Sequence, residues 1–231
     1  MTIISNSRRF IFVHIPKCGG TSVTYHLTNL VQWNDIEIGT TIFGKALLPA
    51  FRERFGLTKH SPAAAIRRVV GKELWTSYTT FAVVRNPFAR AVSTFRYLQR
   101  LAAHPHAPKH LKPAVGVLGS LDDFVCSDYW MTEGFDGMHR PQSYFVTDRK
   151  TGERLIVDRV LKLEAIADDC SALNGLLGVE GLVDTRLPER NRAPEDSDEL
   201  SLSGRVVEAI IARYRRDFEM FDYPLSVPQG L

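Results

Sequence analysis

Two apolar runs, each followed at once by a helix start, constrain the fold of this chain more than any other feature. Residues 10–15 and 79–84 are continuously apolar or β-branched over the length of one strand, the pattern of a strand covered on both faces. Residues 16–20 break the first run before a helix, and Asn86-Pro87 caps and starts a helix after the second. This alternation predicts an α/β fold with a central, largely parallel sheet flanked by helices.

Other elements are predicted from periodicity and capping residues. Ser61 is expected to cap a helix that has Pro62 in its first position, and the most periodic helix has an apolar stripe from Val206 to Phe218. Further predicted elements are a short helix at 120–127, strands at 155–157 and 160–163, and a helix at 167–177. Residues 33–59, 102–119 and 184–202 are read either as lids and binding loops or as segments with undetected short elements, which we favour for 33–59.

Composition excludes a disordered chain and a disulfide-dense scaffold. A chain of 231 residues predicts one domain, 1–231, with a frayed tail at 225–231. Because 29 Lys and Arg residues nearly balance 26 Asp and Glu residues, we expect no nucleic-acid partner, and any anion site has to be local. No stretch suits a membrane span or signal peptide, and Cys18, Cys126 and Cys170 form no metal or disulfide pattern, so we expect a cytoplasmic location.

The first candidate site is the segment His-Ile-Pro-Lys-Cys-Gly-Gly-Thr-Ser at residues 14–22. Glycines let the backbone approach an anion, and the following helix N-terminus points unpaired N–H groups at it. Lys17 can add a positive charge, and Thr21 and Ser22 can add hydroxyl donors. The segment therefore predicts a phosphate cradle, although its lysine precedes the glycine pair, unlike the G-x-x-x-x-G-K-[ST] loop.

The second candidate site follows the strand at residues 79–84. Arg85 stands at the carboxyl end of that strand, where α/β sheets bind ligands, and Ser93 lies two turns into the next helix. A guanidinium and a hydroxyl placed in this way can reach one phosphate. The alternative is that Arg85 forms a salt bridge at a helix end and that Ser93 only fills space.

Together the motifs P-K-x-G-G-T-S and R-N-P-x-x-R-x-x-S resemble those of sulfotransferases that use 3′-phosphoadenosine-5′-phosphosulfate (PAPS). The resemblance is closest to the carbohydrate-type branch, which includes heparan sulfate 2-O-sulfotransferases and small bacterial relatives. It implies a P-loop-like three-layer fold and an enzyme that transfers a sulfuryl group from PAPS to a hydroxyl without a metal. The implied product is adenosine 3′,5′-bisphosphate, and the implied acceptor is a carbohydrate or glycosylated metabolite.

The resemblance also assigns roles to residues. The first loop would hold the 5′-phosphosulfate through Pro16, Lys17, Cys18, Gly19, Gly20, Thr21 and Ser22. Arg85 and Ser93 would hold the 3′-phosphate. The stretch Arg190-Asn191-Arg192 loosely matches a family segment, so Arg192 is expected to close over the nucleotide, with a solvated charged loop as the alternative.

Transfer to a hydroxyl needs a base, and neutral imidazole suits that role near neutral pH. Among seven histidines His60 is the best placed, because it directly precedes a helix start whose dipole disfavours imidazolium. We expect His60 to act as the base and Lys17 to stabilise the leaving oxygen, with a surface or capping histidine as the alternative. His14 is expected to be packed and hydrogen-bonded.

Other readings stay open. Residues 128–135 are rich in aromatics, which suits either a sugar-binding surface or a local hydrophobic cluster. His104, His106 and His110 predict a solvated loop, because their spacing fits no zinc site. The alternative functions are a P-loop kinase, which would need magnesium, and a nucleotide-binding protein without catalysis.

Overall fold

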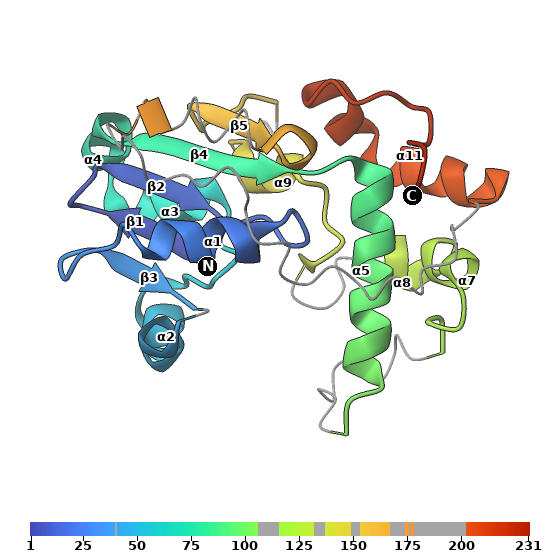
Figure 1. Cartoon of the computed structure of the whole chain (residues 1–231), viewed down its shortest axis with the longest axis horizontal. Coiled ribbons are helices and arrows are strands. Elements are labelled where there is room, and N and C mark those ends of the chain that lie inside the picture. Colours follow the sequence, from blue (N-terminus) through green and yellow to red (C-terminus); the bar gives the residue numbers. More distant parts are fainter. Residues whose placement is uncertain are drawn as a thin grey trace. The chain divides into compact units, whose positions relative to one another are not determined.

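The computed structural model describes residues 1–39, 41–105, 116–131, 137–148, 153–166, 174–175, 177 and 202–231. The chain divides into two compact units. The first unit comprises residues 1–84 and 142–192, and the second comprises residues 85–141 and 193–231. Figure 1 labels the elements of both units.

The first unit contains a five-stranded sheet in the order β3-β1-β2-β4-β5. The strands are β1 (Thr2–Ser5), β2 (Phe10–Val13), β3 (Ile36–Ile38), β4 (Thr79–Val84) and β5 (Arg159–Lys162). Strands β2, β4 and β5 are parallel, whereas β1 is antiparallel to both of its neighbours. The predicted α/β fold is therefore confirmed, with a parallel core and an antiparallel edge that the periodic pattern did not indicate.

Helix α1 (Gly20–Thr28) covers one face of this sheet (Figure 1). Its Val23 and Leu27 belong to a buried cluster with side chains of four strands. The cluster consists of Met1, Ile3, Phe10, Phe12, Val23, Leu27, Leu30, Phe81, Val83 and Leu161. Because successive strand residues point to opposite faces, Ile11 and Ala82, which are also buried, belong to the other face.

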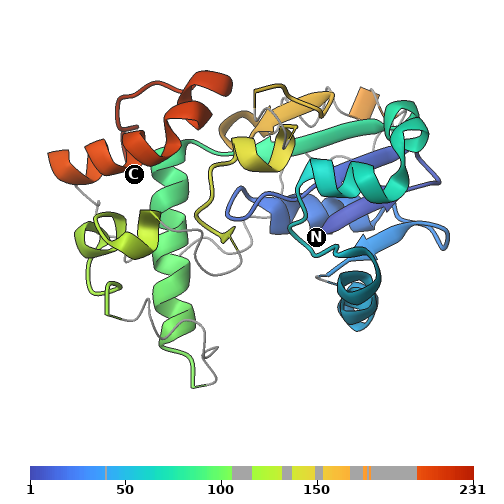
Figure 2. The ribbon, with the colours of Figure 1, turned by 180° about the vertical axis from the view of Figure 1, so that it is seen from behind.

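That other face is covered by α3 (Ala63–Val70), α4 (Lys72–Ser77) and α9 (Ser143–Val146), which Figure 2 shows in front of the sheet. Helices thus lie on both faces, which buries the continuously apolar strands. Beside the edge strand β3 lies α2 (Ile42–Phe55), where the Thr41 hydroxyl accepts a hydrogen bond from the Gly44 N–H. Residues 33–59 therefore contain short elements, as we favoured.

Two local predictions are wrong. Helix α3 begins at Ala63 rather than Pro62, because the Ser61 hydroxyl accepts the Thr58 N–H at 2.7 Å and so closes the preceding turn instead of capping the helix. Residues 155–157 form no strand, since Leu155 makes only an isolated bridge to Thr147. The strand predicted at 160–163 is present as β5 and continues into a 3₁₀ turn over Leu163–Ala165.

The second unit is built from helices α5 (Pro87–Ala102), α7 (Leu121–Val125), α8 (Asp128–Met131) and α11 (Gly204–Met220). The Asn86 side chain accepts the N–H groups of Phe88 and Ala89, and Pro87 takes the first turn of α5, as predicted. Helices α5, α7 and α11 pack around one buried cluster. Its side chains include Phe88, Val92, Phe95, Phe124, Trp130, Val206, Ile210, Tyr214 and Phe218.

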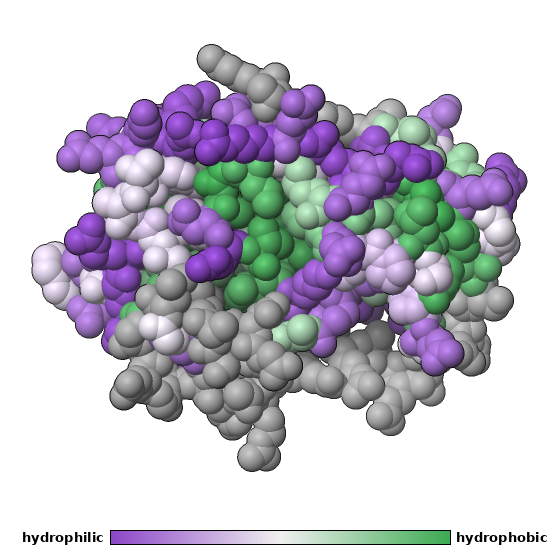
Figure 3. Space-filling model, turned by 90° about the horizontal axis from the view of Figure 1, so that it is seen from above, coloured by the Kyte–Doolittle hydropathy of each residue, from purple (hydrophilic) through white to green (hydrophobic). Residues whose placement is uncertain are grey.

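Hydrophilic side chains cover much of the surface shown in Figure 3, with hydrophobic patches between them. Among the described residues, no helix is long and apolar enough to cross a membrane.

Candidate functional site

The loop between β2 and α1 is the segment predicted to be an anion cradle, and this name is kept for it below. Lys17 and Gly19 both adopt left-handed backbone conformations, each with φ of 66°. Left-handed residues alternating with right-handed ones turn successive N–H groups toward one side of the chain. Ser22 and Val23 donate their N–H groups to the Gly19 carbonyl and so begin α1, whose first N–H groups have no acceptor within the helix.

The left-handed conformation of Lys17 strains its backbone. A left-handed conformation costs a residue with a side chain roughly 1–2 kcal/mol, and glycine avoids most of that cost. Strained non-glycine residues cluster at active sites and ligand clamps. Lys17 is partly exposed and has a φ of 66°, which is consistent with a functional loop, and Arg9 and Asp222 adopt similar conformations elsewhere, with φ of 54° and 51°.

The two glycines of the loop are required by close packing. A Cβ on Gly19 would collide with the side chain of Leu163, which follows β5. A Cβ on Gly20 would collide with the imidazole ring of His14. The cradle therefore sits directly against the carboxyl ends of β5 and β2.

Cys18 faces away from the cradle. Its thiol is 1% exposed and donates a hydrogen bond to Oε1 of the fully buried Gln142 at 3.0 Å. The side chain therefore packs in the interior, and any contribution of Cys18 to anion binding comes from its main chain. Gln142 is a supporting residue that no sequence pattern indicated.

His14 is packed between the cradle and the sheet. Its ring is 8% exposed, stacks on Phe12 with centroids 5.9 Å apart, and contacts the amino group of Met1 through Nδ1. Burial lowers the pKa of His14 well below its usual value, and electrostatic interactions with the amino terminus, His60 and Lys59 lower it further. His14 is therefore neutral near neutral pH.

His60 lies beside His14, with ring centroids 4.5 Å apart. Its Nδ1 lies 3.1 Å from the carbonyl oxygen of His14. Because a carbonyl oxygen only accepts, Nδ1 carries the hydrogen in the neutral ring, and Nε2 is then the basic nitrogen. The fold thus brings His60 to the strand end that carries the cradle.

Arg85 follows β4 directly. Since β2 and β4 are parallel neighbours, with Val13 opposite Ala82, their carboxyl ends lie at the same edge of the sheet. Within the second unit, Ser93 is partly exposed on α5, one turn beyond the partly exposed Ala89. A small residue at position 89 leaves room on that side of the helix.

The second arginine of the R-N-P-x-x-R-x-x-S motif has a structural role. Arg90 is fully buried and donates to the carbonyl oxygens of Arg140 at 2.8 Å and Met138 at 2.9 Å. Its guanidinium lies 5.4 Å from the centroid of the Tyr214 ring. Arg90 therefore holds residues 138–140 against the core of the second unit.

In the described part of the aromatic segment that begins at Asp128, the structure shows a hydrophobic cluster rather than a sugar-binding surface. Trp130 is fully buried and packs edge-on against Phe124 and Tyr214. Its ring also stacks on His139, with centroids 5.6 Å apart. Trp130 is therefore a core residue rather than a surface for sugar rings.

Several candidate residues lie outside the described part of the chain. They are Arg190, Arg192, His106, His110, Cys170 and residues 132–136, together with the side chain of Thr21. Among the residues that the structure describes, no group of three or more His, Cys, Asp and Glu side chains is arranged to hold a metal ion.

The fold and the site define a class. An α/β sheet with a strained glycine loop between a strand and a helix N-terminus is an architecture that binds phosphate or sulfate groups. The sequence matches the model of the sulfotransferase family over residues 1–224. The chain belongs to this family and is an enzyme that transfers a sulfuryl group.

Similarity to other known proteins is limited to part of the chain. An uncharacterized protein from Archaeoglobus fulgidus is 29% identical over 136 residues, which cover 59% of this chain and 95% of that protein. The comparison with solved structures found no match. Neither similarity assigns the chain to the carbohydrate-type branch.

Proposed function

We propose that the protein transfers the sulfuryl group of PAPS to a hydroxyl of a carbohydrate or glycosylated metabolite. The observation that carries the proposal is the left-handed Lys17 and Gly19 loop at the N-terminus of α1. It provides backbone donors and a cation for a sulfate or phosphate group, with His60 held at the same strand end through the His14 carbonyl.

Different residues of the chain bind the two ends of the proposed donor. The segment from Pro16 to Ser22 binds the 5′-phosphosulfate, through main-chain N–H groups and the Lys17 ammonium. Arg85 and Ser93 bind the 3′-phosphate by a guanidinium fork and a hydroxyl. Arg192 is proposed to close over the nucleotide. PAPS supplies the sulfuryl group together with a bisphosphate leaving group.

His60 is the proposed base. Its Nε2 accepts the proton of the acceptor hydroxyl while that oxygen bonds to sulfur, and the Nδ1 hydrogen bond to His14 keeps the ring oriented. Lys17 and the loop N–H groups stabilise the negative charge that develops on the bridging oxygen as its bond to sulfur breaks. Lysine and the helix terminus supply this stabilisation, so the proposal includes no metal.

Calorimetry with nucleotides tests donor binding. Adenosine 3′,5′-bisphosphate is expected to bind without magnesium and more tightly than ATP, because only the bisphosphate presents a 3′-phosphate to Arg85 and Ser93. Tighter binding of ATP that depends on magnesium would instead indicate a P-loop kinase.

Substitution of His60 tests the base. His60→Ala is expected to lower turnover by about a hundredfold to ten-thousandfold, the range for general-base catalysis, and to keep the affinity for adenosine 3′,5′-bisphosphate. Sulfate transfer from labelled PAPS to a broad acceptor panel measures the first, and calorimetry measures the second. The exposed His104 provides a control, His104→Ala, that should change neither. Near-normal turnover of His60→Ala would show that another group is the base.

A further inference from the structure

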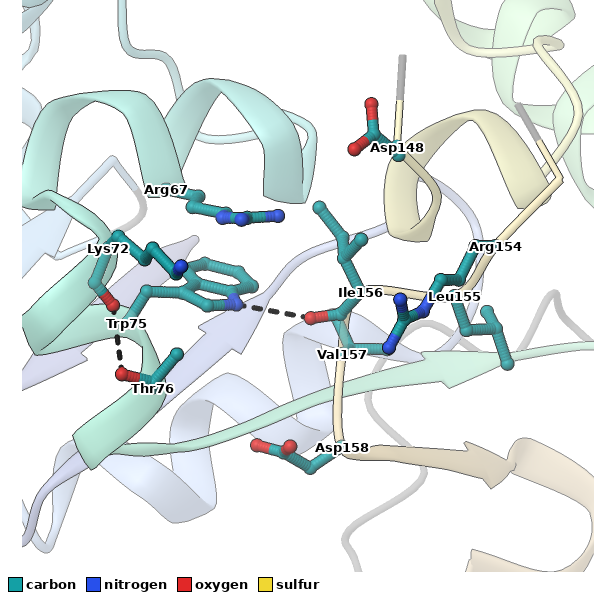
Figure 4. Close-up of a pocket in the computed structure, with 10 residues that line it drawn as sticks. All are labelled: Arg67, Lys72, Trp75, Thr76, Asp148, Arg154, Leu155, Ile156, Val157 and Asp158. Carbon is teal, nitrogen blue, oxygen red and sulfur yellow. Dashed lines mark hydrogen bonds between the residues drawn. The ribbon is translucent and has the colours of Figure 1, made fainter. Parts of the chain in front are cut away.

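A groove unrelated to the cradle lies in the first unit, with a volume of about 670 Å³ (Figure 4). Arg67 on α3, together with Lys72 and Trp75 on α4, forms one side, and the segment 154–158 before β5 forms the other. The groove therefore lies at the amino ends of β4 and β5. The cradle follows the carboxyl end of the parallel strand β2, at the opposite edge of the same sheet.

The walls of the groove are held in place by hydrogen bonds. The indole Nε1 of Trp75 donates to the Ile156 carbonyl at 3.1 Å, which joins α4 to the facing segment. The Asp148 N–H donates to the Arg154 carbonyl at 3.0 Å, and Ile156 donates to Val146 at 2.9 Å. These bonds preform the site, which reduces the ordering that a ligand would otherwise require.

The lining carries three cations and two carboxylates, which leaves a net charge of +1. Within the described part of the chain, the side chains of Arg67, Lys72 and Arg154 form no ion pair. Of the two lining carboxylates, Asp158 is already bound, because its Oδ2 accepts the N–H and hydroxyl of Thr80 at 2.8 Å each. Three cations thus line the groove with Asp148 as the other carboxylate.

The positions of the cations in the fold indicate the kind of ligand. They come from three different elements across an open groove, an arrangement that suits several anionic groups along a chain better than one small ion. Leu155, which is 36% exposed, and the half-buried Ile156 line the groove beside Arg154 and offer apolar contact to the C–H faces of sugar rings, whereas the ring of Trp75 is only 5% exposed.

We propose that this groove binds the sulfate or carboxylate groups of an acidic oligosaccharide, as an accessory site separate from the donor cradle. The choice of a saccharide rests on the proposed carbohydrate acceptor. The binding itself does not depend on sulfuryl transfer.

The test measures binding of a short dextran sulfate by calorimetry in a Lys17→Ala background, which weakens the cradle as a competing anion site. Arg67→Gln with Arg154→Gln is expected to raise the Kd about tenfold for each arginine lost, which corresponds to about 1.4 kcal/mol each. The matched control is Arg52→Gln with Arg68→Gln, which removes the same charge from exposed positions outside the groove and should leave the Kd unchanged.

Each other outcome overturns the proposal. Equal weakening in both double variants would show only an effect of net charge. Neutral dextran bound as tightly as dextran sulfate would exclude recognition of anions, and sodium sulfate bound as tightly would indicate a site for a free ion. Tighter binding of a single-stranded oligonucleotide would assign the groove to nucleic acid.

The donor measurement keeps this proposal separate from the proposed function. With Lys17 intact, the groove double variant should bind adenosine 3′,5′-bisphosphate as the unmodified protein does. If the bisphosphate fails to bind either protein, the donor assignment is wrong, and the dextran sulfate result still decides the groove.

Discussion

At the scale of single residues, the cradle combines backbone strain at Lys17 with the burial of His14. Lys17 adopts a conformation that favours glycine, and His14 is buried as a neutral ring beside a second histidine. Both features oppose stability, so the rest of the fold must enforce them. Each leads to a measurable prediction.

Two substitutions of Lys17 are expected to have the same effect on turnover and different effects on stability. Lys17→Ala and Lys17→Gly are both expected to lower turnover about a hundredfold to a thousandfold, as loss of one charge stabiliser does. Lys17→Gly relieves the left-handed strain, so its free energy of unfolding should exceed that of Lys17→Ala by about 1 kcal/mol. Steady-state kinetics and urea unfolding measure the two effects. Identical unfolding midpoints for the two variants would mean that the loop relaxes in solution.

His14 predicts a pH dependence of stability. Its pKa in the folded protein lies well below the usual value of 6.5, so below pH 6.5 the unfolded chain binds a proton that the folded protein does not. The free energy of unfolding should therefore fall as the pH drops below 6.5, by up to about 1.4 kcal/mol per pH unit, until the folded pKa is reached.

Urea unfolding of His14→Gln at several pH values checks this effect. The variant should lose part of the slope below pH 6.5, whereas the exposed His104→Gln should keep it. The amino group of Met1, whose pKa burial also lowers, contributes a slope at higher pH, below its usual value of 8.0, in all three proteins. Equal slopes for His14→Gln and the unmodified protein would contradict the buried neutral state.

At the scale of elements, the site depends on how closely α1 approaches β2. Capping and periodicity predicted the strand at 79–84 and the helix after Asn86-Pro87, because those signals lie within the segments themselves. The antiparallel strands β1 and β3, of four and three residues, were not predicted, since such short strands show little periodicity. The Ser61 cap failed because its hydroxyl has a nearer partner in Thr58.

Two glycines that begin helices test the close approach. Gly20→Ala places a Cβ against the His14 ring and should therefore lower both the free energy of unfolding and the turnover, because His14 in turn orients His60. Gly204→Ala at the start of α11 meets no atom within 4 Å and should be neutral or slightly stabilising. Thermal unfolding and kinetics of both variants provide the comparison. A Gly20→Ala protein with normal stability and turnover would show that His14 can move without consequence.

At the scale of the whole molecule, one motif serves two purposes. Arg85 follows β4 and is proposed to bind the donor, whereas Arg90, five residues on, anchors the core of the second unit. The match to the motif does not by itself distinguish the role of Arg85 from that of Arg90. Only burial and hydrogen bonding distinguish them.

Alanine variants of the two arginines should therefore differ in kind. Arg85→Ala is expected to weaken binding of adenosine 3′,5′-bisphosphate about tenfold or more while stability is retained, because it removes a charge-assisted contact. Arg90→Ala is expected to lower the free energy of unfolding by about 3 kcal/mol or more, since it removes the hydrogen bonds to the Met138 and Arg140 carbonyls and opens a cavity. Calorimetry and urea unfolding of each variant measure both quantities. If Arg85→Ala instead lowered stability and Arg90→Ala only weakened binding, Arg85 would be the structural residue and Arg90 the binding residue.

By itself, the sequence determined the α/β class, the main strand-to-helix units and the loop that carries Lys17 and Gly19, because each depends on neighbours a few residues away. The tertiary structure decided which side chains support that loop. Gly20 lies against His14, His60 binds the His14 carbonyl from 46 residues away, and Cys18 binds Gln142 from 124 residues away. Such contacts follow from how strands and helices pack, so no local pattern encodes them.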